Sequence, residues 1–197
     1  MVLPKLDVVA VLTGVVPDGE KRYPVSALID KIVSAVKSDK PLPPDPESQA
    51  VLKASLLKAA TEQATPVGPA SDLVDAVSKK TWRFGDNELL VRAIRLNLAA
   101  VTPTFELTIY SRNPGGGDTI LSEPIGLDGR SRGKVAPYAF VANKGNWLDS
   151  RTFLLERRFL GNGAMVYWTL QFDGDHLNLR FRNTDGYAIE LRGEPVN

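Results

Sequence analysis

The sequence predicts a mainly β protein, α+β overall, in which a C-terminal antiparallel β-barrel of about eight strands follows one strand and two helices. Beyond residue 77, apolar and polar residues alternate, and a period of two is typical of strands with one buried face. Roughly eight short strands with turn residues between them fit into about 115 residues, as in all-β barrels and sandwiches. We expect a barrel, because closing the sheet removes its two edge strands.

Composition divides the chain into three parts. We expect a strand and a helix in residues 1–39, a proline-rich linker with a second helix in residues 40–76, and the barrel in residues 77–197. The prolines at positions 41, 43, 44 and 46 forbid helix and favour extended backbone, so a domain boundary is expected there.

The N-terminal elements follow from two kinds of pattern. Residues 6–12, LDVVAVL, are β-branched and almost continuously apolar, which predicts a strand covered on both faces. Residues 25–37 have apolar residues at helical spacing, with Ser26 as the expected N-cap. Residues 46–65 are rich in helix-forming residues and predict a second helix.

Two hairpins are expected near the C-terminus, among strands at residues 166–172, 177–181 and 187–191. Asp173 and Gly174 predict a two-residue type I′ loop, which would place Phe172 opposite Asp175 and Leu170 opposite Leu177. A three-residue loop at 184–186, with its glycine in the left-handed region, would place Leu179 opposite Leu191.

The other expected strands precede these hairpins. They cover residues 81–84, 89–98, 105–110, 119–127 and 152–160. Residues 113–117 predict a glycine-rich turn, and residues 130–134 predict a basic loop.

Bulk composition restricts the classes of partner. The chain has 24 Lys and Arg against 23 Asp and Glu, so its net charge of +1 favours neither nucleic acid nor an anionic membrane. With no cysteine, disulfides, thiolate zinc sites and a cysteine nucleophile are excluded. No apolar run is long enough for a membrane span or a signal peptide.

Two short motifs suggest a serine nucleophile. Ser34 with Lys37, and Ser55 with Lys58, match the Ser-x-x-Lys pattern in which the lysine assists deprotonation of the serine. The companion motif Lys-Thr-Gly is absent from the sequence, and no tyrosine is followed two residues later by asparagine. We therefore interpret both matches as chance placements on amphipathic helices and predict no catalytic residue.

Histidine and the acidic turn residues predict no metal or cofactor site. His176 is the only histidine, and its alternation with Leu177 places it on the outer face of a strand. Asp173, Asp175 and Asp185 are explained by turn chemistry, because a calcium loop needs more closely spaced oxygen ligands.

The aromatic and basic residues allow two interpretations each. Trp82, Trp147 and Trp168 are the candidate ligand-lining residues of a lipocalin-like barrel, although such aromatics more often form the core. Six basic residues could form an anion-binding rim, although a solvated charged surface is the preferred interpretation. They are Arg130, Arg132, Lys134, Lys144, Arg157 and Arg158.

Two separated stretches resemble one family. Residues 3–14, LPKLDVVAVLTG, with residues 27–33, resemble the last strand and terminal helix of the catalytic domain of bacterial serine hydrolases of the β-lactamase and penicillin-binding-protein-like superfamily. The later stretches resemble the C-terminal β domain appended to some of these enzymes. They are residues 82–84, 124–129, 145–149, 152–156 and 169–175.

This resemblance implies a non-catalytic accessory domain. In that superfamily the nucleophilic serine, its lysine and the other catalytic motifs precede the final strand, so none of them can be assigned here. The implied partner is a catalytic domain N-terminal to this chain, in a periplasmic or secreted hydrolase of amides or esters. Residues 6–12 would then pair with a second copy or dock onto the β domain. The alternatives are a small-ligand-binding barrel and a self-sufficient hydrolase.

Overall fold

The computed structural model describes residues 2–11, 25–38, 40, 43–111, 115–136, 139–161 and 163–196. The chain forms two compact units, Met1–Glu62 and Gln63–Asn197. The division at residues 39 and 76 expected from composition stays a prediction, and residues 63–76 belong to the same unit as the barrel strands.

The first unit begins with a small hairpin. Strand β1 (Val2–Leu3) pairs with β2 (Val8–Val9) around a 3-10 helix, Pro4–Leu6. The predicted single strand over residues 6–12 is therefore wrong, because Leu6 ends the 3-10 helix and Asp7 turns the chain with a φ of 52°. Residue 12 lies outside the described residues.

Two helices follow in this unit. Helix α1 spans Val25–Ala35, so Ser26 lies inside the helix and its prediction as the N-cap is wrong. Helix α2 spans Pro46–Ala60 and ends before the predicted residue 65. Asp45 caps α2, because its side chain accepts the backbone N–H of Ser48 at 3.0 Å, and the helix buries none of its residues.

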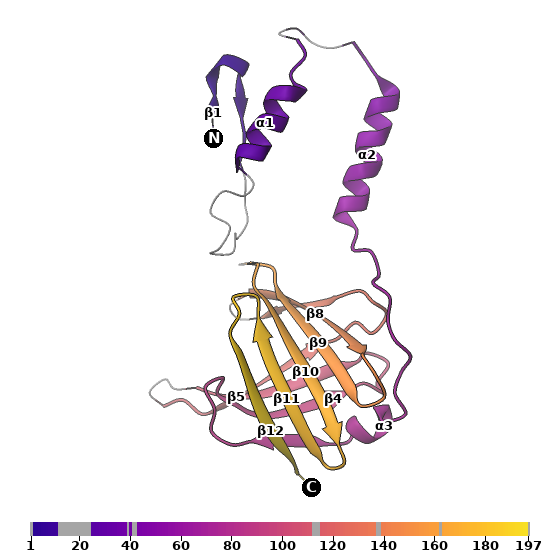
Figure 1. Ribbon diagram of the computed structural model, residues 1–197, viewed down its shortest axis with the longest axis vertical. Coiled ribbons are helices and arrows are strands. Elements are labelled where there is room, and N and C mark those ends of the chain that lie inside the picture. Colours follow the sequence, from indigo (N-terminus) through magenta and orange to yellow (C-terminus); the bar gives the residue numbers. More distant parts are fainter. Residues whose placement is uncertain are drawn as a thin grey trace. The chain divides into compact units, whose positions relative to one another are not determined.

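The second unit is a β-barrel with one short helix, α3 (Val74–Val77). Its strands form one antiparallel sheet in the order β6-β5-β4-β3-β12-β11-β10-β9-β8-β7. Figure 1 shows β9–β12 as the near wall, in orange to yellow, with β4 and β5 crossing behind it. The strands are β3 (Thr81–Phe84), β4 (Val91–Asn97), β5 (Thr104–Tyr110), β6 (Asp118–Pro124), β7 (Arg132–Ala136), β8 (Ala139–Trp147), β9 (Thr152–Phe159), β10 (Met165–Asp173), β11 (His176–Asn183) and β12 (Ala188–Val196).

The barrel is nearly closed where β6 and β7, the two ends of the strand order, come together. Gly126, just after β6, forms a parallel bridge with Lys144 of β8. The N–H of Gly126 donates to the Asn143 carbonyl at 3.1 Å, and the Gly145 N–H donates to the Gly126 carbonyl at 2.9 Å. We call this region, from β6 across Gly126 to β7 and β8, the seam.

Strands β7 and β8 are absent from the prediction, which placed a basic loop at residues 130–134. The inward positions of β8 include Asn143 and Gly145, which interrupt the apolar alternation. Gly145 is required there, since a Cβ would collide with the ring of Phe153 and with Ile125. The predicted antiparallel barrel is confirmed, and among the described residues it has ten strands, because β7 and β8 add to the eight predicted ones.

The barrel interior is a packed apolar core. Its members come from the inward positions of strands on all sides and are almost completely shielded from solvent. They include Trp82, Ile94, Leu96, Phe105, Leu107, Phe153, Leu155, Leu170, Leu177 and Leu179.

The first C-terminal hairpin has a different register from the predicted one. Phe172 lies opposite Leu177, and the two-residue loop is formed by Gly174 and Asp175 rather than by Asp173 and Gly174. Gly174 has a φ of 59° whereas Asp175 has no positive φ, which is typical of a type II′ turn with glycine first. The second hairpin is as predicted, with Leu179 opposite Leu191.

Replacing Gly174 by alanine should lower the free energy of unfolding by about 1–2 kcal/mol, because a Cβ is strained in the left-handed region. Urea unfolding followed by tryptophan fluorescence measures the change. Gly85→Ala is the matched control, since Gly85 has no positive φ and its Cβ would meet no atom within 4 Å. Equal stability of the two variants would contradict the turn assignment.

Candidate functional site

The candidate ligand-lining tryptophans all lie in the barrel core. Trp82, Trp147 and Trp168 are 2%, 6% and 3% exposed. The ring of Phe172 lies between two of them, with its centroid 5.3 Å from that of Trp82 and 5.8 Å from that of Trp147. Phe181 makes an edge-on contact with Trp168 at 5.7 Å. These rings pack against one another, and whether they also line a ligand stays a prediction.

The indole nitrogens differ in their partners. Nε1 of Trp82 donates to the Asp175 carbonyl at 3.3 Å. Within the described residues, the buried Nε1 of Trp168 has no hydrogen-bond partner. A buried donor without an acceptor costs about 1–3 kcal/mol, so this N–H is a point where an acceptor could bind.

A buried polar network lies at the seam. Arg157 on β9 donates through Nη2 to both carboxylate oxygens of Glu123 on β6, at 2.8 and 3.0 Å. Asn143 on β8 donates through Nδ2 to Glu123 at 3.1 Å and to the Pro124 carbonyl at 3.1 Å. The side chains of Arg157 and Glu123 are only 8% and 4% exposed. The network therefore ties three strands together from inside the barrel.

The guanidinium of Arg157 also lies over two aromatic rings. Its Cζ is 5.2 Å from the ring centroid of Phe105 and 5.3 Å from that of Phe159, within the range of cation–π attraction. The guanidinium of Arg157 thus makes its ion pair, its hydrogen bonds and its ring contacts with residues of the barrel interior.

The six basic residues do not form a common rim. Arg157 points into the barrel, while its neighbour Arg158 is exposed. Arg132 pairs with Asp128 at 2.8 Å, Lys144 lies 3.6 Å from Glu156, and Lys134 bonds the Ser122 carbonyl at 2.9 Å. Arg130 is exposed. Most of these cations already have an oxygen partner of the same chain, so they offer little to an external anion.

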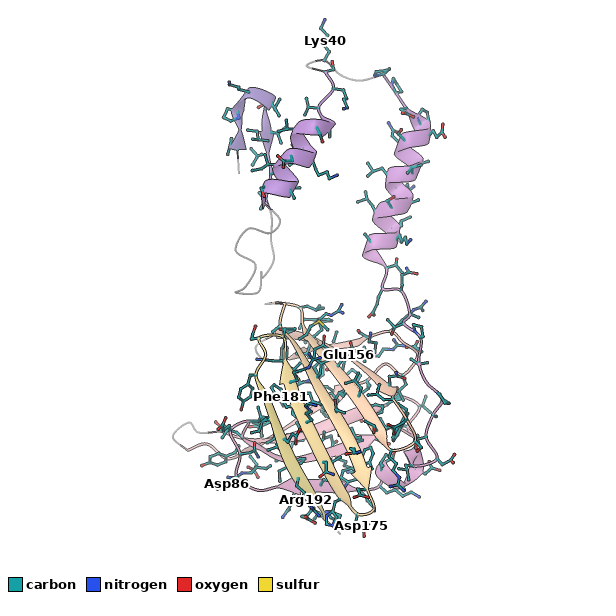
Figure 2. All side chains as sticks on the ribbon, in the orientation of Figure 1. Lys40, Asp86, Glu156, Asp175, Phe181 and Arg192 are labelled. Carbon is teal, nitrogen blue, oxygen red and sulfur yellow. The ribbon has the colours of Figure 1, made fainter. Side chains whose placement is uncertain are left out.

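The outer face of β9–β12 carries a depression of about 580 Å³. Its polar lining follows the strand register, with Gln171 between Thr152 and Asn178 in one row, and Arg180 between Thr169 and Glu190 in the next. Figure 2 shows Arg192 and Asp175 toward one end of this wall and Glu156 toward the other. The lining offers hydrogen bonds but contains no serine, cysteine or histidine.

His176 lies on the outer face of its strand, as predicted. Its Nδ1 is 2.8 Å from Oε2 of Glu194 on β12, and the two side chains are 41% and 58% exposed. Asp173 and Asp175 lie at one hairpin, whereas Asp185 lies at the next, where it accepts from Asn183 at 3.3 Å. Among the residues that the structure describes, no three histidine, cysteine or acidic side chains gather as metal ligands would.

Lys80 fixes the tip of the first hairpin. Its Nζ donates to Asp175 at 2.6 Å, and this hydrogen bond, with the lysine charge, lowers the pKa of the Asp175 carboxyl. Because the folded pKa lies below the unfolded one, the contribution to stability is present above the unfolded pKa and is lost as pH falls through the folded pKa.

Replacing Lys80 by methionine should therefore raise the pKa of Asp175 toward its ordinary value of about 3.9. Carboxyl chemical shifts followed by NMR between acid and neutral pH measure this change. Arg151→Met is a control at the same end of the barrel, because Arg151 lies 3.8 Å from Asp173 instead. An unchanged pKa in the Lys80 variant would show that the contact does not form in solution.

The two Ser-x-x-Lys matches lie on exposed helices of the first unit. Ser34 Oγ donates to the carbonyl of Lys31, one turn earlier in α1, at 3.0 Å. Lys37 lies beyond the end of that helix. Ser55 and Lys58 are both exposed on α2. Within the described residues of the first unit, both serines are therefore exposed on their helices.

None of the helices in the described parts of the chain has the length and apolarity to cross a bilayer. No protein-family model matches the chain, and no curated protein matches it.

Proposed function

We propose that this chain is a non-catalytic accessory domain of a larger serine hydrolase, and that its barrel packs against the catalytic domain. The observation that carries the proposal is the filled barrel interior, where the ring of Phe172 contacts those of Trp82 and Trp147. A barrel filled by its own side chains acts through its outer surfaces, and packing against another domain needs only such a surface. The family resemblance of residues 3–14 and of the β region supplies the nature of the partner.

The coding DNA immediately upstream of Met1 tests the identity of the partner. We expect an in-frame extension of several hundred residues that contains a Ser-x-x-Lys motif. When that region is expressed separately, addition of this chain should raise the melting temperature of the catalytic domain. The two should also co-elute in size-exclusion chromatography. A stop codon directly upstream, or no association between the two, would contradict the proposal.

Hydrolysis assays separate this proposal from a self-sufficient hydrolase. The purified chain should leave nitrocefin and a p-nitrophenyl ester unchanged relative to buffer. The variants Ser34→Ala and Ser55→Ala are the controls. Hydrolysis by the chain that disappears in either variant would overturn the non-catalytic assignment.

A second candidate function, a lipocalin-like small-ligand barrel, is favoured by the unpartnered indole N–H of Trp168. A ligand with an apolar body and one acceptor would satisfy this donor. Screening such compounds by quenching of tryptophan emission, with Trp168→Phe as the variant, tests this candidate. Quenching in the native chain that is lost in Trp168→Phe would favour it over the accessory domain.

Two further properties belong to this proposal. By resemblance, the parent hydrolase works in the periplasm or outside the cell. Residues 6–12 would mediate a homodimer, since Val9 and Val11 are 70% and 79% exposed beside a two-stranded hairpin. Light scattering of the native chain and of Val9→Lys measures the dimer, and a monomer at all concentrations would exclude it.

A further inference from the structure

The segment that precedes α3 lies along the barrel and is fixed to it at every third residue. We call residues 63–72 the strap. Figure 1 shows it in purple, running down the side of the barrel to α3. Its anchors are Thr65, Gly68 and Ser71, and each bonds to a different part of the barrel.

The contacts of the anchors are specific. The N–H of Thr65 donates to the Gly129 carbonyl at 2.9 Å, and its hydroxyl accepts from Lys144 Nζ at 3.3 Å. The N–H of Gly68 donates to Oδ1 of Asn146 at 2.7 Å. The hydroxyl of Ser71 donates to the Ser150 carbonyl at 2.6 Å. The strap is thus held by side chains and loops, and not by a strand ladder.

The spacing of three matches a polyproline II helix, which has three residues per turn and no internal hydrogen bonds. Pro66 and Pro69 lie between the anchors, and their fixed φ favours this conformation. Val67, between the anchors, is 43% exposed. One edge of such a helix faces the barrel, and the other two face solvent.

The barrel surface beneath the strap accepts only a small residue at its centre. A Cβ at Gly68 would lie 2.5 Å from the carbonyl oxygen of Trp147, which belongs to rigid backbone. Next to this point, Pro69 lines a depression of about 230 Å³ together with Trp147 and Leu148. The Trp147 ring itself packs in the barrel core, so the strap meets the main chain of this residue.

We propose that the surface formed by Gly129, Lys144, Asn146 and Ser150 is a docking groove for polyproline II segments of the pattern Thr-Pro-x-Gly-Pro-x-Ser, and that the strap is its resident ligand. The groove recognises two main-chain N–H groups, two hydroxyls and the absence of a side chain at the central position. This inference depends only on contacts within the barrel unit, so it stands or fails independently of the proposed function.

Amide exchange in the full-length chain tests the docking. In the native chain, the N–H groups of Thr65 and Gly68 should exchange at least about tenfold more slowly than those of Val67 and Ala70, as one hydrogen bond of about 1.4 kcal/mol implies. Asn146→Ala should remove the protection at Gly68, while the amides of β10 and β11 stay protected. Equal exchange at all four strap amides of the native chain would overturn the inference.

Binding of a separate peptide tests the groove itself. Gly68→Ala in the full-length chain should release the strap, and a fluorescein-labelled peptide of residues 63–72 should then bind it at least about tenfold more tightly than it binds the native chain, whose groove is occupied. Gly117→Ala, where a Cβ meets no atom within 4 Å, is the matched control and should behave like the native chain.

The result that overturns the groove is a folded Gly68→Ala chain, judged by native tryptophan emission, that binds no peptide. Should Gly68→Ala fail to fold, Ser71→Ala takes its place, because it removes an anchor of the strap and leaves the groove intact. The peptide should then bind Ser71→Ala more tightly than the native chain. A folded Ser71→Ala chain that binds no peptide would overturn the groove.

Discussion

Replacing Glu123 by glutamine is expected to lower the free energy of unfolding by about 3–5 kcal/mol. The variant keeps the size of the side chain but leaves the guanidinium of Arg157 buried and charged without a carboxylate. Arginine cannot lose its proton, and Asn143, whose Oδ1 accepts from Arg157 at 3.4 Å, cannot neutralise the charge. Urea unfolding followed by tryptophan fluorescence measures the loss.

Two further variants make this result specific. Glu190→Gln removes a carboxylate that faces Arg180 at 3.8 Å on the exposed wall, and it should cost no more than about 1 kcal/mol. The double variant Glu123→Leu with Arg157→Met should recover most of the loss, because apolar side chains of similar size can replace a buried ion pair. If Glu123→Gln costs no more than Glu190→Gln, the seam is not closed by the ion pair.

Replacing Phe172 by alanine should lower the free energy of unfolding by about 3–5 kcal/mol. Phe172 is 3% exposed, and its ring lies between those of Trp82 and Trp147. Its removal leaves a cavity that the surrounding strands, held by their ladders, can only partly fill. The same unfolding experiment measures the loss, and the emission of both tryptophans should change in the folded state.

Leu160→Ala is the matched control for Phe172. Leu160 is 52% exposed, so its truncation should change stability by no more than about 0.5 kcal/mol. A small effect at Phe172 would mean that the interior can collapse around the missing ring. It would also count against a rigidly packed barrel interior, which is the observation that supports the accessory role.

The strands with clear alternation could be predicted from the sequence, because burial of one face imposes the period of two. The pairing register of a hairpin could be predicted only where the sequence allows a single position for the loop. The loop at 184–186 has its glycine with a φ of 90° as expected, and Leu179 faces Leu191. At Asp173, Gly174 and Asp175, either residue pair could form a two-residue loop, and the pattern alone does not distinguish types I′ and II′.

The network at the seam was not predicted, although part of its signal is in the sequence. Arg157 continues the inward series of Phe153 and Leu155, so its position predicts burial. Because arginine is charged, however, the sequence favours a solvent-exposed side chain at this position. Its partner Glu123 is 34 residues away, and only the closure of the barrel brings the two together.

The sequence predicts helix for residues 63–65 of the strap and linker for the rest, for a related reason. Thr65, Gly68 and Ser71 are spaced three residues apart. This spacing predicts a docked segment only when the surface that the three residues contact is known. That surface comes from residues more than sixty positions later, as the contact from Thr65 to Gly129 shows.

Lys134 has a consequence for how the molecule behaves in concentrated solution. Strands β6 and β7 end the sheet order, and the outer main-chain groups of such strands can recruit strands from other copies. The ammonium of Lys134 already occupies the Ser122 carbonyl on this border. An incoming strand would have to displace a charged, hydrated group before its own ladder could form. At this border, the charge of Lys134 therefore disfavours the addition of a strand from another copy.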